Sequence, residues 1–127
     1  MGKRAQILAD TDVLIKVYRG SITQKNILDR HAGAIAVSVI TYLELLYGVR
    51  SRSRIIDLNK QMRSYNLIHL SESISQEAVA LMIKYGNRHS VRLADALIAS
   101  TAILFKLQLF TDNKQDFDFI EGIHFLQ

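Results

Sequence analysis

The chain has 127 residues, 49% of them hydrophobic, which suits one folded domain over residues 1–127 with its own core. It has no cysteine, which excludes disulfides, thiolate zinc sites and cysteine nucleophiles and is compatible with the reducing cytoplasm. The 16 Lys and Arg residues exceed the 12 Asp and Glu residues, and the net charge of +4 mildly favours polyanionic partners. No run of about 18 residues lacks charge, so we expect neither a membrane span nor a signal peptide.

The first half of the chain alternates short apolar runs with helical patterns. The runs at 6–10 and 35–38 are short and apolar, which predicts buried strands. Helices are expected at 12–18 and 22–31. A further helix is expected from Val39 to about Val49, with Ser38 as its N-cap.

The second half continues the same alternation. Helices are expected at 54–65, 73–85, 93–106 and, as a short turn, 113–119. Ser73 and Gln76 have capping-box spacing at the start of the second of these helices. Strands are expected at 67–70, 107–111 and 123–126. Strands that alternate with helices predict an α/β fold, a three-layer α/β/α sandwich with a mostly parallel central sheet.

The helix expected from residue 39 is apolar around its whole circumference. Its apolar residues are Val39, Ile40, Tyr42, Leu43, Leu45, Leu46, Tyr47 and Val49. An amphipathic helix covers a core with one stripe, whereas this pattern requires burial on more than one side. One side can face the sheet, and another is available to a partner protein.

Three carboxylates interrupt segments that are otherwise apolar. Asp10 closes the first strand, Glu44 lies within TYLELLYGV, and Asp95 lies within LADALIASTAILF. A carboxylate in such surroundings is costly unless it gains a cation, several hydrogen-bond donors, a proton or a metal ion. Local partners are one solution, because Asp10 could cap the following helix. Glu44 could likewise pair with Arg50, and Asp95 could cap its helix or pair with Arg92.

A shared metal ion is the other solution. The first carboxylate ends a strand and the other two lie in the first turns of helices, so all three are expected at the carboxyl edge of the sheet. A further acidic group follows the strand at 107–111 and contains Asp112, Asp116 and Asp118. Clustered carboxylates repel one another unless a cation lies among them. Oxygen ligands without cysteine or paired histidines favour Mg²⁺ or Mn²⁺ over zinc.

Such a cation predicts a particular chemistry. It lowers the pKa of a retained water, which attacks a phosphodiester phosphorus while the cation stabilises the phosphoryl oxygens. With the basic surface, this predicts hydrolysis of nucleic acid. Two basic runs adjoin the segments that carry the acids, and each is either solvated surface or a phosphate contact. They are Arg50, Arg52 and Arg54, and Lys84, Arg88 and Arg92.

Four motifs, ILADTDVLI, SVITYLELLYGV, LADALIAS and LFTDNKQDF, follow one another along nearly the whole chain. In this order and spacing they resemble the four motifs of the PIN-domain family. Within that family the chain is most similar to the VapC-type toxins of bacterial and archaeal toxin–antitoxin pairs, which share the E-L-x-x-G form seen at 44–48. The resemblance implies a ribonuclease that uses Mg²⁺ or Mn²⁺, forms a homodimer and is inhibited by a small cognate antitoxin.

The resemblance also implies roles for particular residues. Asp10, Glu44 and Asp95 match the metal-site acids of the family, and Asp116 fits its N-x-x-D-F element. Asp112 stands at a position that is often basic or polar in relatives, so it either assists the site or shifts the fourth ligand. Donors expected to orient the carboxylates are Thr11, Ser38, Thr111 and Asn113.

Two other functions fit part of the pattern. D-T-D after the first strand also resembles the opening of aspartyl-phosphate phosphatases, in which Asp10 would be the nucleophile and Asp12 the acid. That chemistry leaves Glu44 unexplained, and Asp12 otherwise reads as a surface or helix-start residue. A module that binds RNA or a partner without cleaving is the other alternative, although all acids needed for catalysis are present.

Overall fold

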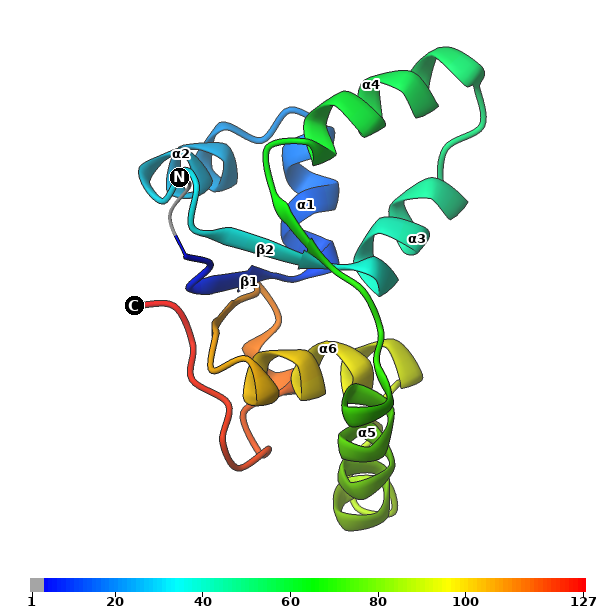
Figure 1. The fold of residues 1–127 in the computed structure, drawn as a ribbon, viewed down its shortest axis with the longest axis vertical. Coiled ribbons are helices and arrows are strands. Elements are labelled where there is room, and N and C mark those ends of the chain that lie inside the picture. Colours follow the sequence, from blue (N-terminus) through cyan, green and yellow to red (C-terminus); the bar gives the residue numbers. More distant parts are fainter. Residues whose placement is uncertain (1–3) are drawn as a thin grey trace.

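Four short parallel strands form the centre of the molecule (Figure 1), whose computed structural model describes residues 4–127. They are β1 (Ile7–Ala9), β2 (Ile35–Ser38), β3 (Asn66–Ile68) and β4 (Gln108–Phe110), in the order β3-β2-β1-β4. All neighbouring pairs are parallel, and Leu8 of β1 lies opposite Ala36 of β2 and Leu109 of β4. The four carboxyl ends therefore point to one edge of the sheet.

Within residues 4–127, six helices connect and cover the strands. They are α1 (Thr11–Tyr18), α2 (Ile22–Arg30), α3 (Val39–Tyr47), α4 (Arg52–Met62), α5 (Glu72–Tyr85) and α6 (Leu93–Leu104). Figure 1 shows α1, α2 and α4 on one side of the sheet and α5 and α6 on the other. Helix α3 reaches both layers, because Leu45 belongs to the first core and Ile40 packs against the second. No helix in residues 4–127 has the length and apolar character to span a bilayer.

The alternation of side chains along β1 explains the two layers. Ile7 and Ala9 pack into the core beneath α1, α2 and α4, whereas Leu8 packs into the core beneath α5 and α6. All three are nearly inaccessible to solvent. A strand buried on both faces reads as a continuous apolar run, which is why these short segments could be predicted as strands. The predicted α/β/α sandwich is confirmed.

The C-terminal segment differs from the prediction. The strand expected at 123–126 is wrong, since only Phe125 forms a bridge, to Leu109 of β4. The chain enters this segment through Gly122 in the left-handed region, with φ 96°, and runs beside β4 over too short a length for a ladder. The helix expected at 113–119 is a single 3₁₀ turn, η1 (Lys114–Asp116).

The start of α5 also differs. Ser71 is the N-cap, and its Oγ accepts a hydrogen bond from Ile74 N at 3.2 Å. The capping box predicted from Ser73 and Gln76 is therefore wrong. Gln76 Nε2 instead donates to Glu72 Oε1 at 3.2 Å, one helical turn earlier. The serine that precedes an acidic first turn is the cap favoured by the helix dipole.

Candidate metal centre

Asp10 lies where β1 meets β4, and it is 5% exposed. Its backbone N donates to Phe110 O at 2.9 Å, which continues the β1–β4 pairing by one residue. Its Oδ1 accepts from Thr11 N at 2.8 Å, so it caps α1 as the simpler interpretation predicted. Its Oδ2 accepts from Thr111 Oγ1 at 2.9 Å. Both oxygens are thus fixed by residues that follow the neighbouring strands β1 and β4.

Glu44 approaches the same edge from α3 and is half-buried. Its Oε1 accepts a hydrogen bond from Thr11 Oγ1 at 2.7 Å. Thr11 Oγ1 also lies 2.9 Å from Oγ1 of Thr41, a fully buried residue one turn before Glu44. The alternative ion pair between Glu44 and Arg50 is not among those formed within residues 4–127. Thr11 therefore contacts two of the predicted acids, Asp10 and Glu44.

Asp95 is the third residue of α6 and is 5% exposed. Arg92 Nε lies 3.5 Å from Asp95 Oδ2, so the predicted local ion pair exists, but Arg92 is largely exposed. Burial raises the pKa of Asp95 above its usual value against the lowering effect of Arg92, and the charges of Asp116 and Glu44 raise it further. Three of the four predicted acids are thus close enough to influence one another.

Burial and a neighbouring charge act in the same way on Asp10. Burial, followed by the charge of Asp12, raises the pKa of Asp10 to about 7, against the opposing hydrogen bonds from Thr111 and Thr11. The raised pKa means that the ionised form of this carboxyl is destabilised by its surroundings. A cation at this edge would remove that penalty.

Asp12 has a larger role than the sequence indicated. Its Oδ1 accepts from Val13 N at 2.8 Å, as expected at the start of a helix. Its Oδ2 accepts from Asn113 Nδ2 at 2.8 Å and from Asp112 N at 3.1 Å, which ties α1 to the loop after β4. The D-x-D spacing directly after a strand was the available signal for this bridging role.

The acidic group after β4 separates into different environments. Asp112 Oδ2 accepts from Lys16 Nζ at 2.7 Å and from Gln24 Nε2 at 3.2 Å, so it is bound by α1 and α2. Asp116 ends η1 with its side chain exposed, and Asp118 is exposed as well. Sequence reasoning missed Lys16, although it lies one helical turn after Asp12 on the same face of α1.

The predicted orienting donors have distinct contacts. Thr11 and Thr111 donate to acids of the site as described, and Asn113 donates to Asp12. Ser38 is buried and caps α3, because its Oγ accepts from Ile40 N at 3.1 Å. We therefore assign Ser38 a role in starting α3, the helix that carries Glu44.

Residues of the two basic runs have different surroundings. Lys84, in the last turn of α5, pairs with Glu121 at 3.2 Å. Arg54 has a different position, since it lines a pocket of about 210 Å³ together with Arg19 and Glu44. The side chains in this pocket come from α1, α3 and α4. Two guanidinium groups thus share a pocket with one of the site acids.

The donor set suits a hard divalent cation. Its groups are carboxylate and hydroxyl oxygens, and two of the carboxylates are buried with raised pKa values. Within residues 4–127, no three His, Asp or Glu side chains are gathered closely enough to hold a metal ion in their present rotamers. The hydrogen bonds from Thr11 and Thr111 and the ion pair with Arg92 are the contacts that these carboxylates make in those rotamers.

Comparison with known proteins finds similarity along nearly the whole chain. The family model described as the PIN domain matches residues 7–121. Ribonuclease VapC10 of Mycobacterium tuberculosis is 35% identical over 120 residues, which cover 92% of this chain and 90% of that protein. Ribonuclease VapC1 of Rickettsia felis is 30% identical over 131 residues, with 94% of each chain covered.

Solved structures are similar over the same length. A chain of a toxin–antitoxin complex from Klebsiella pneumoniae is 31% identical and has a TM-score of 0.81, with 93% of this chain and 95% of that chain covered. A chain of the DNA-bound VapBC complex from Salmonella typhimurium is 19% identical and has a TM-score of 0.84, with 96% and 97% covered, and it supports the fold alone. The resemblance read from four motifs is confirmed, and the chain belongs to the PIN-domain family.

Proposed function

We propose that this chain is an Mg²⁺- or Mn²⁺-dependent endoribonuclease and the toxin of a toxin–antitoxin pair, acting as one domain in the cytoplasm. The observation that carries the proposal is that Asp10, Glu44 and Asp95 all lie at the carboxyl edge of the sheet. Thr11 contacts the first two, and the charge of Glu44 raises the pKa of the third. The ribonuclease relatives, similar over more than nine-tenths of the chain, support the same activity.

The residues proposed to hold the cation are Asp10, Glu44, Asp95 and Asp116. When bound, a divalent cation lowers the pKa of a water molecule and neutralises charge on the phosphoryl oxygens. Asp112 is not included, because Lys16 and Gln24 occupy its outer carboxylate oxygen. The burial that raises the pKa values of Asp10 and Asp95 also reduces competition from solvent for their oxygens.

The surrounding residues orient the acids. Thr11 donates from its backbone to Asp10 and from its hydroxyl to Glu44, so one residue sets the separation of two carboxylates. Thr111 fixes the second oxygen of Asp10. Such donors hold ligand carboxylates in productive orientations, and their loss typically lowers activity tenfold to a hundredfold. Arg19 and Arg54, which share a pocket with Glu44, are proposed to bind phosphates of the RNA backbone.

A homodimer and a small antitoxin are the proposed protein partners. Leu43 and Tyr47 of α3 are 54% and 86% exposed, so the apolar helix predicted from the sequence does present an uncovered face. The similar chain from Klebsiella pneumoniae was solved within a toxin–antitoxin complex. A monomer by light scattering at micromolar concentration would contradict the homodimer.

The phosphatase alternative is disfavoured by Asp12. An acid in that mechanism must face the reacting phosphate, whereas Asp12 Oδ2 accepts hydrogen bonds from Asn113 Nδ2 and Asp112 N. Trapping of a phosphoaspartate at Asp10 would revive this alternative.

The test is cleavage of RNA by the purified protein with Mg²⁺, with Mn²⁺ and with EDTA. We expect cleavage only with a divalent cation and a loss of about a thousandfold in Asp10→Asn and Asp95→Asn, as several kcal/mol of charge stabilisation disappear. Asp57→Asn is the matched control, because Asp57 is an exposed carboxylate on α4. Folding of each variant is checked by circular dichroism. Undiminished cation-dependent cleavage by both variants would overturn the assignment.

A further inference from the structure

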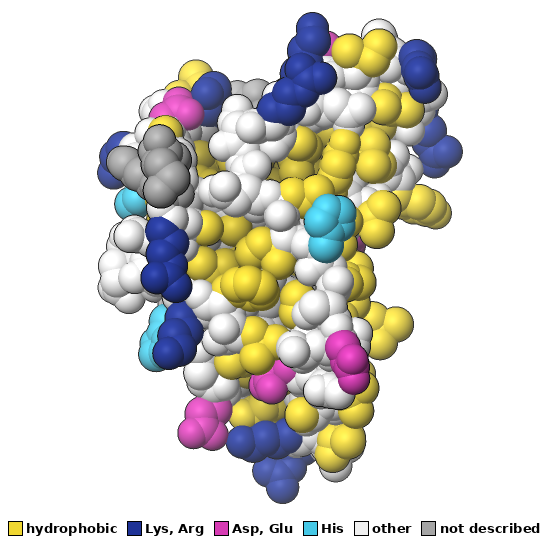
Figure 2. Space-filling view, viewed as in Figure 1, with side chains coloured by type: hydrophobic (Ala, Val, Ile, Leu, Met, Phe, Trp, Pro, Cys, Tyr) yellow, Lys and Arg dark blue, Asp and Glu magenta, His cyan; other side chains and the backbone are white. Residues whose placement is uncertain are grey.

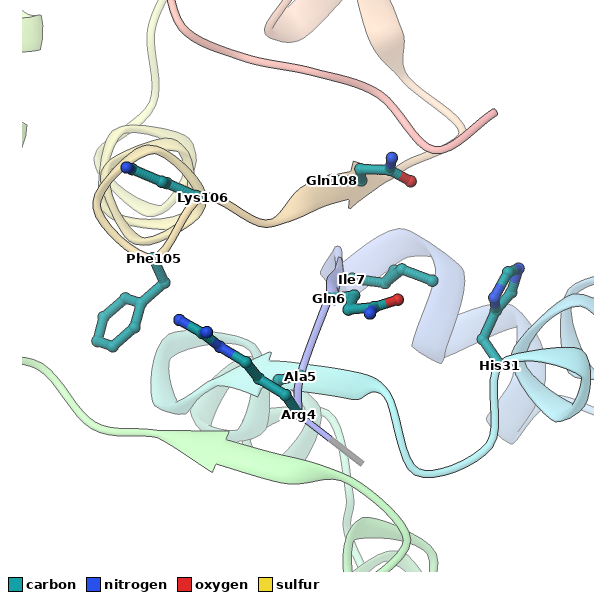
Figure 3. A pocket seen from close by; sticks show the side chains of 8 residues that line it. All are labelled: Arg4, Ala5, Gln6, Ile7, His31, Phe105, Lys106 and Gln108. Carbon is teal, nitrogen blue, oxygen red and sulfur yellow. The ribbon is translucent and has the colours of Figure 1, made fainter. Parts of the chain in front are cut away.

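A pocket of about 390 Å³ lies at the amino end of the sheet, opposite the carboxylates. Figure 3 shows Phe105, Lys106 and Arg4 toward one end of this pocket and His31 toward the other. Its floor includes Ile7 of β1, and its wall includes Gln108, the first residue of β4. Phe105 is 51% exposed, which is unusual for a phenylalanine and leaves a ring face available.

A second pocket of about 250 Å³ adjoins the first along β4. The two pockets share His31, and where Gln108 lines the first, the next residues of β4 line the second. The lining of the second pocket includes Thr111, the residue that donates to Asp10 at 2.9 Å. We call these adjoining pockets the edge groove. Three residue steps along a strand cover about 10 Å, so the edge groove leads from the amino end of the sheet to the carboxylate site.

The edge groove is basic. Its cationic and titratable lining residues are Arg4, Arg30, His31, Lys106 and Lys114. Of the described residues, none that lines it has an acidic side chain, and none of these five forms an ion pair within residues 4–127. Figure 2 shows Lys, Arg and His side chains gathered along the edge of the molecule between α2 and the C-terminal segment. Unpaired cations in a groove create a positive potential that attracts polyanions.

Lys106 occupies a backbone position that a lysine rarely takes. It follows α6 with φ 54°, the only positive φ among non-glycine residues in 4–127. Leu107 N donates to Ala102 O at 2.9 Å and Lys106 N to Ile103 O at 3.2 Å, which form a Schellman motif. Glycine adopts this conformation without steric penalty, whereas lysine does not. Retention of lysine here points to a use for its side chain.

We propose that the edge groove binds the backbone of single-stranded RNA and leads it to the carboxylate site. Lys106 and Arg30 contact phosphates, and Phe105 stacks on a base. A positive groove that follows the backbone, with an aromatic platform for a base, is the general form of single-strand recognition. The proposal rests on the proposed ribonuclease function, since it assigns a path to the same substrate.

A purely structural role for these cations is the alternative. Arg30 ends α2 and Lys106 follows α6, and positive charge stabilises the carboxyl ends of helices. That role predicts that their removal lowers stability and leaves RNA binding unchanged. The edge-groove role predicts that replacing Lys106 weakens RNA binding and does not lower stability. Stability is kept because asparagine and glycine, the two replacements used below, both suit the backbone conformation of this position.

The experiment measures binding of fluorescein-labelled single-stranded RNA of about 16 nucleotides by anisotropy in EDTA, over a range of salt concentrations. The groove variant is Arg30→Gln/Lys106→Asn. The control variant, Lys60→Gln/Arg63→Gln, removes two exposed charges from the end of α4, outside the edge groove. We expect only the groove variant to bind the RNA about tenfold more weakly than the natural chain. The slope of the logarithm of its binding constant against the logarithm of salt concentration should fall in magnitude by about 1.4, the value for two lost phosphate contacts.

Equal effects of the groove and control variants, or no effect of either, would overturn the proposal. Lys106→Gly is the second variant. We expect it to bind RNA more weakly than the natural chain while its stability is unchanged or higher. Single-stranded DNA of the same sequence is a parallel probe, and equal losses for it assign the contact to phosphate rather than to the ribose hydroxyl. Binding is measured without a divalent cation and does not depend on cleavage. If the protein did not cleave RNA, the proposed function would be refuted, and the binding assay would still test the edge groove. Cleavage of RNA of about 4 nucleotides should be unaffected by the groove variant.

Discussion

The carboxyl end of the sheet carries buried acidic residues, whereas the amino end carries solvent-exposed basic residues. At the carboxyl end, Asp10 and Asp95 are buried, and burial raises the pKa of each. At the amino end, Arg4 and Lys106 line an open pocket and have no ion-pair partner within residues 4–127. Negative charge is therefore concentrated and desolvated at one end, while positive charge is spread and solvated at the other.

The direction of the chain accounts for the signs of these charges. In a parallel α/β sheet the helices begin at the carboxyl end and finish at the amino end, so their dipoles favour acids at the first and bases at the second. The dipoles do not account for the particular residues. Asp10 is an acid with a pKa of about 7, and Lys106 is a lysine at φ 54°. Each end thus retains one residue that stability alone would not select.

The largest expected effect is a difference in RNA cleavage between variants of two acids at the carboxyl end, Glu44 and Asp112. Glu44→Gln should lower kcat/KM for RNA by about a hundredfold or more, because a charge proposed to hold the cation is lost while the shape is kept. Asp112→Asn should change it by less than about threefold, because Asp112 is partly exposed and already paired with Lys16. Steady-state cleavage with Mn²⁺ measures both. Similar losses in the two variants would place Asp112 among the ligands.

The next effect concerns the cost of burying Asp10. Its pKa is about 7 in the folded chain against 3.8 for the unperturbed group, so the folded state binds more protons than the unfolded state between these values. Stability from this group is complete below pH 3.8 and is lost as the pH rises through 7. The loss amounts to at most about 4 kcal/mol. Asp10→Asn should therefore unfold at higher urea concentration than the natural chain at about pH 8 in EDTA.

Asp57→Asn is again the matched control, and its stability relative to the natural chain should not vary with pH. Addition of Mg²⁺ or Mn²⁺ should stabilise the natural chain, since a ligand that binds only the folded state favours folding. The same addition should have little effect on Asp10→Asn. A difference between Asp10→Asn and the natural chain that stays constant from about pH 4 to pH 8 would contradict the penalty assigned to Asp10.

The sequence predicted most of the fold because the central strands β1 and β2 are buried on both faces. The runs at 6–10 and 35–38 were recognisable without periodicity. The observed β1 is one residue shorter at each end than predicted, and the observed β2 has the predicted bounds. The C-terminal strand was not predictable in the same way. Whether residues 123–126 pair with β4 depends on the turn at Gly122 and on the length left beside an edge strand, and neither is a property of the local pattern.

The sequence predicted which acids lie at the carboxyl edge of the sheet, and their binding of a cation stays a prediction. Carboxylates within apolar segments pointed to Asp10, Glu44 and Asp95, and the structure brings them to the expected edge. The contacts between segments could not be read from the sequence. The bridge from Asp12 to Asn113 spans 101 residues, and the pairing of Lys16 with Asp112 spans 96. Long-range contacts between exposed polar residues produce no periodic pattern in the sequence, so these roles could be recognised only from the folded structure.

The smallest expected effect tests the amino end. Lys106→Gly should stabilise the chain by about 1 kcal/mol, because it removes the steric cost of the left-handed conformation and loses a smaller favourable interaction with the end of α6. Urea unfolding at neutral pH measures the change, and Lys60→Gly in the last turn of α4 should instead destabilise the chain. A less stable Lys106→Gly would mean that the lysine serves the fold. A more stable one would match Asp10→Asn at the other end, and both ends of the sheet would then hold charges that the fold tolerates rather than needs.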